Sequence, residues 1–231
     1  MIIAPLLVVA LAAVENGSVT GIVRAAGKPQ ARPPTAIAKD AAVCGRQAAA
    51  EAPRIGADGA LANVVVVLRG ARPSAPPAPS PNASIDQVGC RYKPHVQAVT
   101  VGTTLAVLNN DAVFHNVHAV SATGPAITLF NVAMPFKGQR LPTLLKRPGV
   151  MKLRCDAGHT WMTAWVHVVE HPWFAVTNDK GAFTIAGVPA GKYSLEYWHE
   201  PLDDRSPPAL KSTPVEVTSG STTTADVRLT L

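Results

Sequence analysis

The residues of this chain that are best able to do chemistry lie close together around Cys155. Segment 152–162 reads KLRCDAGHTWM, so Cys155, His159 and Met162 follow one another within one short stretch. If this stretch joins two adjacent strands, its thiolate, imidazole and thioether can all face one point. Such a set of soft ligands suits a copper ion that cycles between two oxidation states.

A fourth ligand has to come from elsewhere, and segment 108–117 (LNNDAVFHNV) supplies His115, followed by Asn116. Each residue also has an ordinary interpretation. A lone Cys at an apolar strand end is usually a small buried hydrophobe, His115 can be a core histidine with satisfied hydrogen bonds, and Met162 can be simple packing. The joint occurrence of all four in this order favours a metal site.

Together the two segments resemble those of cupredoxins, the blue-copper family. One ligand His of that family stands in an N-x-x-x-x-x-H-N-V type segment, and the others lie on a C-x(n)-H-x(n)-M loop near the domain's end. The resemblance covers residues 85–171. It implies that His115, Cys155 and His159 bind copper, that Met162 is a weak axial ligand, and that Asn116 ties the two ligand segments together by hydrogen bonding.

The spacing C-x3-H-x2-M is tighter between His and Met than in common mononuclear cupredoxins. It resembles half of the loop of the dinuclear copper centre of terminal oxidases, which needs a second loop cysteine. That cysteine is absent here, so the resemblance implies a mononuclear site. Because His159 lies in the middle of the loop, we expect it to be the more exposed ligand.

Three further residues are weaker candidates. His118 follows His115 by three positions, and strand residues three apart point to opposite faces, so we leave His118 out of the metal site. Met134 is a minor candidate that could approach the site in the fold. Trp161 could cover the site or line an electron path. The remaining histidines are expected to be structural or exposed: His95, His167, His171 and His199.

The other two cysteines form an even pair if Cys155 is the ligand. In an exported chain, Cys44 and Cys90 can form a disulfide, which would tie the N-terminal part to the copper domain. The alternative is two unrelated thiols.

Residues 2–13 (IIAPLLVVALAA) are apolar and end in small residues. This run resembles the hydrophobic region of a secretory signal and is too short to span a bilayer. No Lys or Arg precedes it, so a first strand is the alternative. We expect an exported protein, periplasmic or extracellular, without a transmembrane helix.

The composition favours an all-β protein. The chain has 231 residues with 47% hydrophobic residues, 21 prolines and 17 glycines, and its apolar runs are short, β-branched and closed by turn residues. This length suits two compact domains. We therefore expect two β-rich domains, and the resemblances imply that both are β-sandwiches, with a cupredoxin-like Greek-key sandwich at 85–171.

The C-terminal part resembles the carboxypeptidase regulatory-like (transthyretin-like) sandwich, which often reads T-x-x-x-G-x-F-x-I-x-x-V-P-x-G-x-Y-x-L. The matching residues are Thr177, Gly181, Phe183, Ile185, Val188, Pro189, Gly191, Tyr193 and Leu195. The resemblance implies a discontinuous domain of residues 16–71 and 172–231 that follows the signal-like segment 1–13, with a Pro-rich linker at 72–84. The alternative is a tandem arrangement in which 62–68 belong to the middle domain.

The formal net charge is +6, but the basic residues are scattered, so nucleic-acid binding is poorly supported. The charge would favour an acidic redox partner. We expect a one-electron carrier; the alternative is a metal-free or copper-storing surface or adhesion module with a carbohydrate-binding-like sandwich.

An enzyme is not expected. A multicopper oxidase or nitrite reductase needs additional His-rich sites, and the seven histidines include no H-x-H pair. No nucleophile elbow or phosphate loop is present either.

Overall fold

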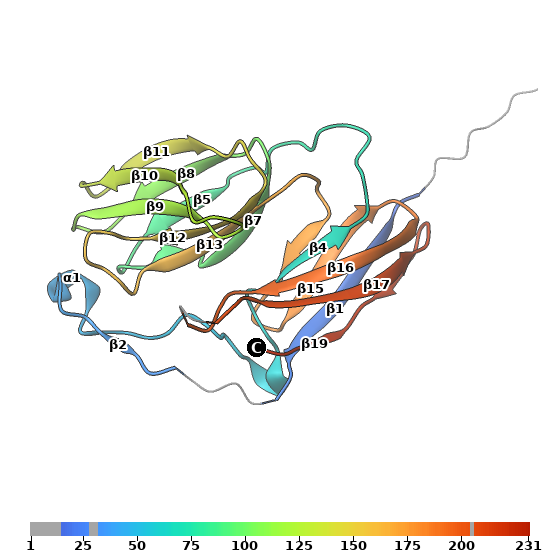
Figure 1. Ribbon diagram of the computed structural model, residues 1–231, viewed down its shortest axis with the longest axis horizontal. Helices are drawn as coiled ribbons and strands as arrows, with labels where there is room; N and C mark the ends of the chain where they lie inside the picture. Colours follow the sequence, from blue (N-terminus) through green and yellow to red (C-terminus); the bar gives the residue numbers. More distant parts are fainter. Residues whose placement is uncertain (1–14, 28–31, 204–205) are drawn as a thin grey trace, which may run out of the picture.

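The computed structural model describes residues 15–27, 32–203 and 206–231. The predicted all-β class is confirmed, because nearly all regular elements are strands arranged in two sandwiches (Figure 1). The signal-like segment 1–13 lies outside the described residues. Within the described part of the chain, no helix combines the length and apolar character needed to cross a membrane.

The strands between residues 84 and 169 form what we call the inner sandwich. One sheet has the order β10-β9-β12-β13-β7 and the other β11-β8-β5-β6. The strands of the first sheet are β7 (Val96–Thr100), β9 (His115–Ser121), β10 (Thr128–Met134), β12 (Gly149–Arg154) and β13 (Thr163–Val169). Those of the second are β5 (Ser84–Gln87), β6 (Tyr92–Lys93), β8 (Thr104–Asn109) and β11 (Gln139–Leu144).

Alternating side chains of these strands fill the core between the two sheets. The wholly buried members include Ile85, Tyr92, Leu105, Val107, Val117, Leu153 and Val166. The same core contains Cys155 and Met162, so both predicted sulfur ligands lie in this apolar layer.

The remaining long strands form the outer sandwich. One sheet contains β1 (Gly17–Ala25), β15 (Ala182–Val188), β18 (Thr222–Thr224) and β19 (Val227–Leu229); the other contains β4 (Val65–Arg69), β14 (Phe174–Val176), β16 (Gly191–His199) and β17 (Ala209–Val217). β4 pairs with β14 and β16. The transthyretin-like assignment and the domain boundaries remain predictions.

Strand β4 is apolar on both faces because it is covered on both. Val66 and Leu68 point into the core of the outer sandwich, whereas Val65 and Val67 belong to a third cluster between the sandwiches. That cluster also contains Val96, Trp165, Val169 and Trp198. The two sandwiches are therefore joined by an apolar interface.

The sequence pattern misses some strands, and proline explains two of them. β11 contains Pro142 and β17 contains Pro214, and both are edge strands of their sheets, where a missing N–H is tolerated. β10 is missed as well. The chain ends in the two short strands β18 and β19, and between them the Asp226 carboxylate accepts a hydrogen bond from the Ile22 N–H.

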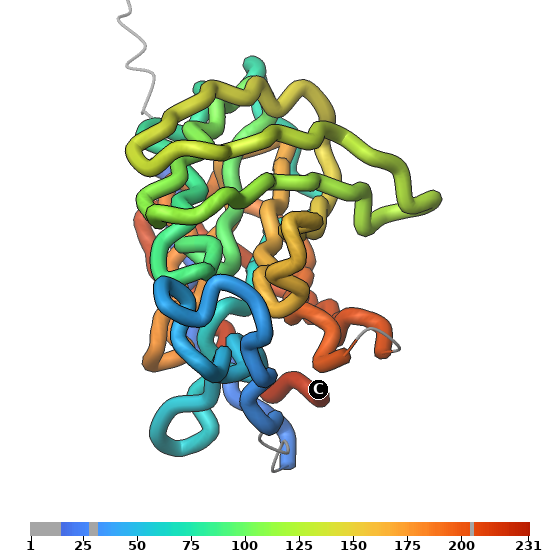
Figure 2. Tube along the Cα trace, turned by 90° about the vertical axis from the view of Figure 1, so that its left-hand side faces the viewer, coloured from blue at the N-terminus to red at the C-terminus, as the bar shows by residue number. Residues whose placement is uncertain are grey.

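Residues 32–53 form a strap outside both sandwiches. It contains β2 (Thr35–Ala36), α1 (Ala41–Cys44) and β3 (Gln47–Ala48), and a short 3-10 turn, η1 (Ala57–Gly59), follows it. The predicted Cys44–Cys90 disulfide is confirmed. Figures 1 and 2 show the strap, in blue, reaching from the outer sandwich to one end of the inner sandwich.

Candidate metal centre

Two neighbouring strands of the inner sandwich position the predicted ligands. His115 begins β9, and Cys155 follows the last residue of β12, which pairs antiparallel with β9. His159 lies in the loop between β12 and β13, where the Met162 N–H donates to the His159 carbonyl at 2.9 Å. Gly158 in this loop has φ +93°, a conformation that glycine adopts readily.

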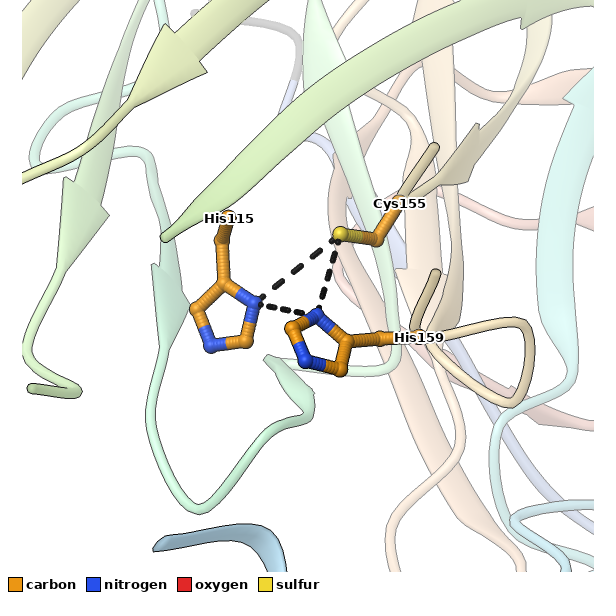
Figure 3. Close-up of side chains that lie close together, drawn as sticks. All are labelled: His115, Cys155 and His159. Carbon is orange, nitrogen blue, oxygen red and sulfur yellow. Dashed lines mark hydrogen bonds between the residues drawn. The ribbon is translucent and has the colours of Figure 1, made fainter. Parts of the chain in front are cut away.

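Three of the four predicted ligands converge. The Cys155 Sγ lies 3.6 Å from the Nδ1 of His159 and 3.9 Å from the Nδ1 of His115, and the two Nδ1 atoms are 3.0 Å apart (Figure 3). Both histidines are 0% exposed and Cys155 is 5% exposed. Cys155 is also a free thiol.

Each imidazole has a carboxylate on its other nitrogen. The Nε2 of His115 lies 3.0 Å from Asp111 Oδ2, and the Nε2 of His159 lies 2.9 Å from Asp40 Oδ2. A carboxylate accepts hydrogen bonds, so it favours the tautomer with hydrogen on Nε2 and a lone pair on Nδ1. Both lone pairs therefore face Cys155.

This arrangement can be tested for fit to a metal by counting hydrogens. With Nε2 of both rings donating to carboxylates, the only hydrogen left for the two Nδ1 atoms and the sulfur is that of the Cys155 thiol. Three electron-pair donors that meet at one point with one hydrogen among them fit a cation. A thiolate with two imidazoles is the donor set of blue-copper sites, so these residues fit copper.

Asn116 connects the two ligand segments. Its Oδ1 accepts hydrogen bonds from the backbone N–H groups of Asp156 and Ala157 at 2.6 and 3.2 Å. Its Nδ2 donates to Asn131 Oδ1 at 2.8 Å, and its carbonyl accepts from the Tyr92 hydroxyl. The residue next to His115 thus holds the residues that follow Cys155.

The structure brings two methionines to the same core. Met162 is wholly buried in the cluster that contains Cys155. Met134 is also wholly buried and is the cross-strand partner of His115 in the β9–β10 pair. Cross-strand partners place their side chains on the same face of a sheet, which makes Met134 a second thioether candidate.

His118 lies outside the cluster. Its Nδ1 lies against Asp156 Oδ2 and its Nε2 against Thr128 Oγ1, so both ring nitrogens have protein partners. Of the other histidines, His167, His171 and His199 are buried, and the half-buried His95 lies against Glu200.

The expected exposure of His159 is wrong, because His159 is 0% exposed. The strap covers it: Asp40 contacts its Nε2, and the Lys39 ammonium donates to the carbonyl of Ala157. The ring of Trp161 adds an edge contact, with ring centroids 5.3 Å apart. Because the strap comes from a distant part of the chain, the sequence around His159 does not indicate that this ligand is covered.

A second group of potential ligands shares His115. Atoms of Cys90, Asp111 and His115 lie within 4.8 Å of one another. The Cys90 sulfur is bound in the disulfide, so it is no thiolate, and the Asp111 carboxylate is occupied by the backbone N–H groups of Gly89 and Cys90, each at 2.7 Å.

Burial lowers the pKa of His115, and the neighbouring charge of His159 lowers it further, against the opposing effect of Asp111. The neutral imidazole that metal binding requires is therefore favoured. Burial, followed by the nearby Cys155, raises the pKa of Tyr92 well above its usual value, so Tyr92 remains a hydrogen-bond donor.

No known protein family and no curated protein matches the chain. Solved structures that it resembles include a cupredoxin, amicyanin mutants and a copper-containing nitrite reductase. A purple cupredoxin from Nitrosopumilus maritimus is 29% identical, with 38% of this chain and 100% of that chain covered and a TM-score of 0.34.

A reduced Cu(I) form of an amicyanin mutant is 22% identical, with 45% of this chain and 98% of that chain covered and a TM-score of 0.34. The Cu-containing nitrite reductase from Thermus scotoductus SA-01 is 23% identical, with 44% of this chain and 24% of that chain covered and a TM-score of 0.33.

Proposed function

We propose that this protein is an exported, mononuclear copper protein that carries one electron at a time. Its ligands are His115, Cys155 and His159, with Met162 as the weak axial ligand. The observation that carries this proposal is the convergence of the Cys155 sulfur and the Nδ1 atoms of His115 and His159, which lie 3.0 to 3.9 Å from one another in the buried interior.

The chain supplies a preformed set of ligands. Asp111 and Asp40 fix the tautomer of the two imidazoles, and Asn116 holds the loop that follows Cys155. Copper, when bound, supplies one-electron chemistry. Ligands held by a rigid sandwich move little when the charge of the metal changes, which favours fast electron transfer over release of the metal.

The proposal includes no catalytic activity. A substrate has to reach the metal, and none of the three ligands is more than 5% exposed. The enclosed ligands thus favour a carrier over an oxidase or reductase of small molecules.

Export and the type of partner follow from other features. The Cys44–Cys90 disulfide fits an oxidising compartment, in agreement with the signal-like residues 2–13. The formal net charge of +6 favours an acidic redox partner through electrostatic steering.

Metal loading followed by redox cycling tests the proposed function. The protein should take up one copper ion per chain and show an intense thiolate-to-copper absorption. One electron equivalent of reductant should bleach this absorption, and reoxidation should restore it with the copper still bound. A protein that stays colourless, or that loses copper when reduced, would contradict the proposal.

A further inference from the structure

The strap touches the ligand loop through two polar contacts. The Asp40 carboxylate lies 2.9 Å from the Nε2 of His159, and the Lys39 ammonium donates a short hydrogen bond to the carbonyl oxygen of Ala157. In sequence, Asp40 precedes the first strand of the inner sandwich by more than forty positions. One copper ligand is thus oriented by a residue that the sandwich itself does not contain.

The disulfide attaches this residue to the inner sandwich. Asp40 is the N-cap of α1, and its carbonyl accepts a hydrogen bond from the Cys44 N–H at 2.9 Å. Cys44 in turn forms the disulfide with Cys90, next to β6. Asp40 therefore lies one helical turn from a covalent anchor.

Cys90, the other end of the disulfide, connects to both imidazoles. Its N–H donates to Asp111 Oδ2, the oxygen that also lies against the Nε2 of His115. Its carbonyl accepts a hydrogen bond from the Trp161 indole at 3.0 Å, and that indole lies edge-on to His159. The disulfide is the point at which the supports of both histidines meet.

We propose that Asp40 is a positioning residue for His159 and that the Cys44–Cys90 bond holds it in place, so that the thiol state of these cysteines controls how firmly copper is bound. This inference rests on the proposed copper site. Opening the bond takes a dithiol reductant: the disulfide gains two electrons and two protons to give two thiols, and the dithiol becomes a disulfide. Cys44 is the half-buried end and Cys90 the buried one.

Asp40→Asn tests the positioning role with the disulfide intact. The matched control is Asp58→Asn, because Asp58 has the same left-handed conformation (φ 54° at both residues) but lies in the exposed turn η1. In the copper-loaded protein, Asp40→Asn should speed copper transfer to a Cu(I) chelator by about 10- to 100-fold. Asp40→Glu should restore most of the wild-type rate.

Two further measurements, the visible absorption and the reduction potential, show whether Asp40 orients His159 or only shields it from solvent. Loss of the carboxylate makes His159 a weaker donor, so Asp40→Asn should shift both the thiolate-to-copper absorption and the reduction potential. Asp58→Asn should shift neither. If Asp40→Asn behaves as Asp58→Asn in all three measurements while the wild type binds copper, the inference is overturned.

The disulfide is tested by a double replacement, Cys44→Ser with Cys90→Ser. Both cysteines are replaced because a free Cys90 thiol would lie within 4.8 Å of His115 and Asp111 atoms and could bind copper itself. The double variant, which has no thiol at either position, should release copper faster than the oxidised wild type. Equal copper-release rates in the double variant and the oxidised wild type would contradict the proposal that the disulfide controls how firmly copper is bound.

Failure of the proposed function looks different. In that case the oxidised wild type itself shows no thiolate-to-copper absorption, whatever the variants do. Should the double variant not fold, Asp40→Asn and Asp40→Glu still decide the positioning role of Asp40, because they leave the disulfide in place.

Discussion

At the scale of single residues, the centre depends on which nitrogen of each imidazole carries hydrogen. Asp111 and Asp40 accept from the two Nε2 atoms, so Nδ1 of His115 and of His159 points at Cys155. Without these carboxylates, either ring can take the other tautomer and present an N–H to the metal. The carboxylates of Asp111 and Asp40 therefore decide whether the two imidazoles can bind a metal ion.

The two buried methionines allow a direct comparison at this scale. We predict that Met162→Leu raises the reduction potential of the copper protein and shifts its visible absorption, because a weak thioether donor is lost. Met134→Leu is the matched control, since it is equally buried in the same core and the exchange conserves volume. The reverse pattern would assign the axial position to Met134.

Asn116 should support the loop even without metal. Asn116→Ala removes the acceptor of two backbone N–H groups and should lower the free energy of unfolding of the metal-free protein by about 2 kcal/mol. Asn131→Ala, which leaves those two bonds intact, should cost less. Urea unfolding of both variants measures the difference, and equal losses would contradict this role.

The sequence predicts the donor atoms but only part of their surroundings. Cys155 and His159 lie on one loop and His115 begins a recognisable strand, so local pattern suffices to group them. Asp40 contacts His159 across 119 positions of sequence, and nothing in the pattern of 32–53 indicates a cover. This long-range contact is the reason that the predicted exposure of His159 is wrong.

At the scale of elements, strand β13 carries a group with a strong pH signature. His167 is 6% exposed, and burial, followed by the charge of Arg69, lowers its pKa to about 3. The unfolded chain binds this proton near pH 6.5, whereas the folded protein does not until about pH 3. The stability that the neutral form contributes is present above pH 6.5 and is lost as the pH falls.

We therefore predict that the free energy of unfolding falls by up to about 1.4 kcal/mol per pH unit from this group between pH 6 and pH 4. His167→Leu should flatten the profile over this range by a comparable slope, as measured by urea unfolding at several pH values. A profile with unchanged slope would show that His167 does not carry the effect.

Element patterns explain which strands the sequence reveals. β4 is predictable as a fully buried strand because both of its faces are covered. β11 and β17 are missed because a proline normally argues against a strand, and both tolerate one at a sheet edge.

At the scale of the whole molecule, the contact between the sandwiches is a small core of its own. Trp198 from β16 packs against Trp165 from β13, with ring centroids 5.3 Å apart, and Glu200 accepts from the Trp165 indole at 2.8 Å. The strap adds a second, covalent connection through Cys44 and Cys90. The two sandwiches are thus expected to unfold as one unit.

Trp198→Ala should weaken this coupling. The substitution should cost about 3–5 kcal/mol and should split the single calorimetric unfolding transition of the wild type into two, since each sandwich keeps its own core. The site should still bind copper, because Trp198 belongs to the interface cluster. If the variant unfolds in one transition at a lower temperature, the claim that each sandwich can unfold on its own is contradicted.

The central claim is that Cys155 provides a thiolate to a copper ion between two histidines, and its most direct test is the visible spectrum of the copper-loaded protein beside that of Cys155→Ser. The account predicts an intense absorption in the wild type that is absent from the variant, whose disulfide remains intact. An identical spectrum in both proteins, or no absorption in either one at full copper loading, would contradict it.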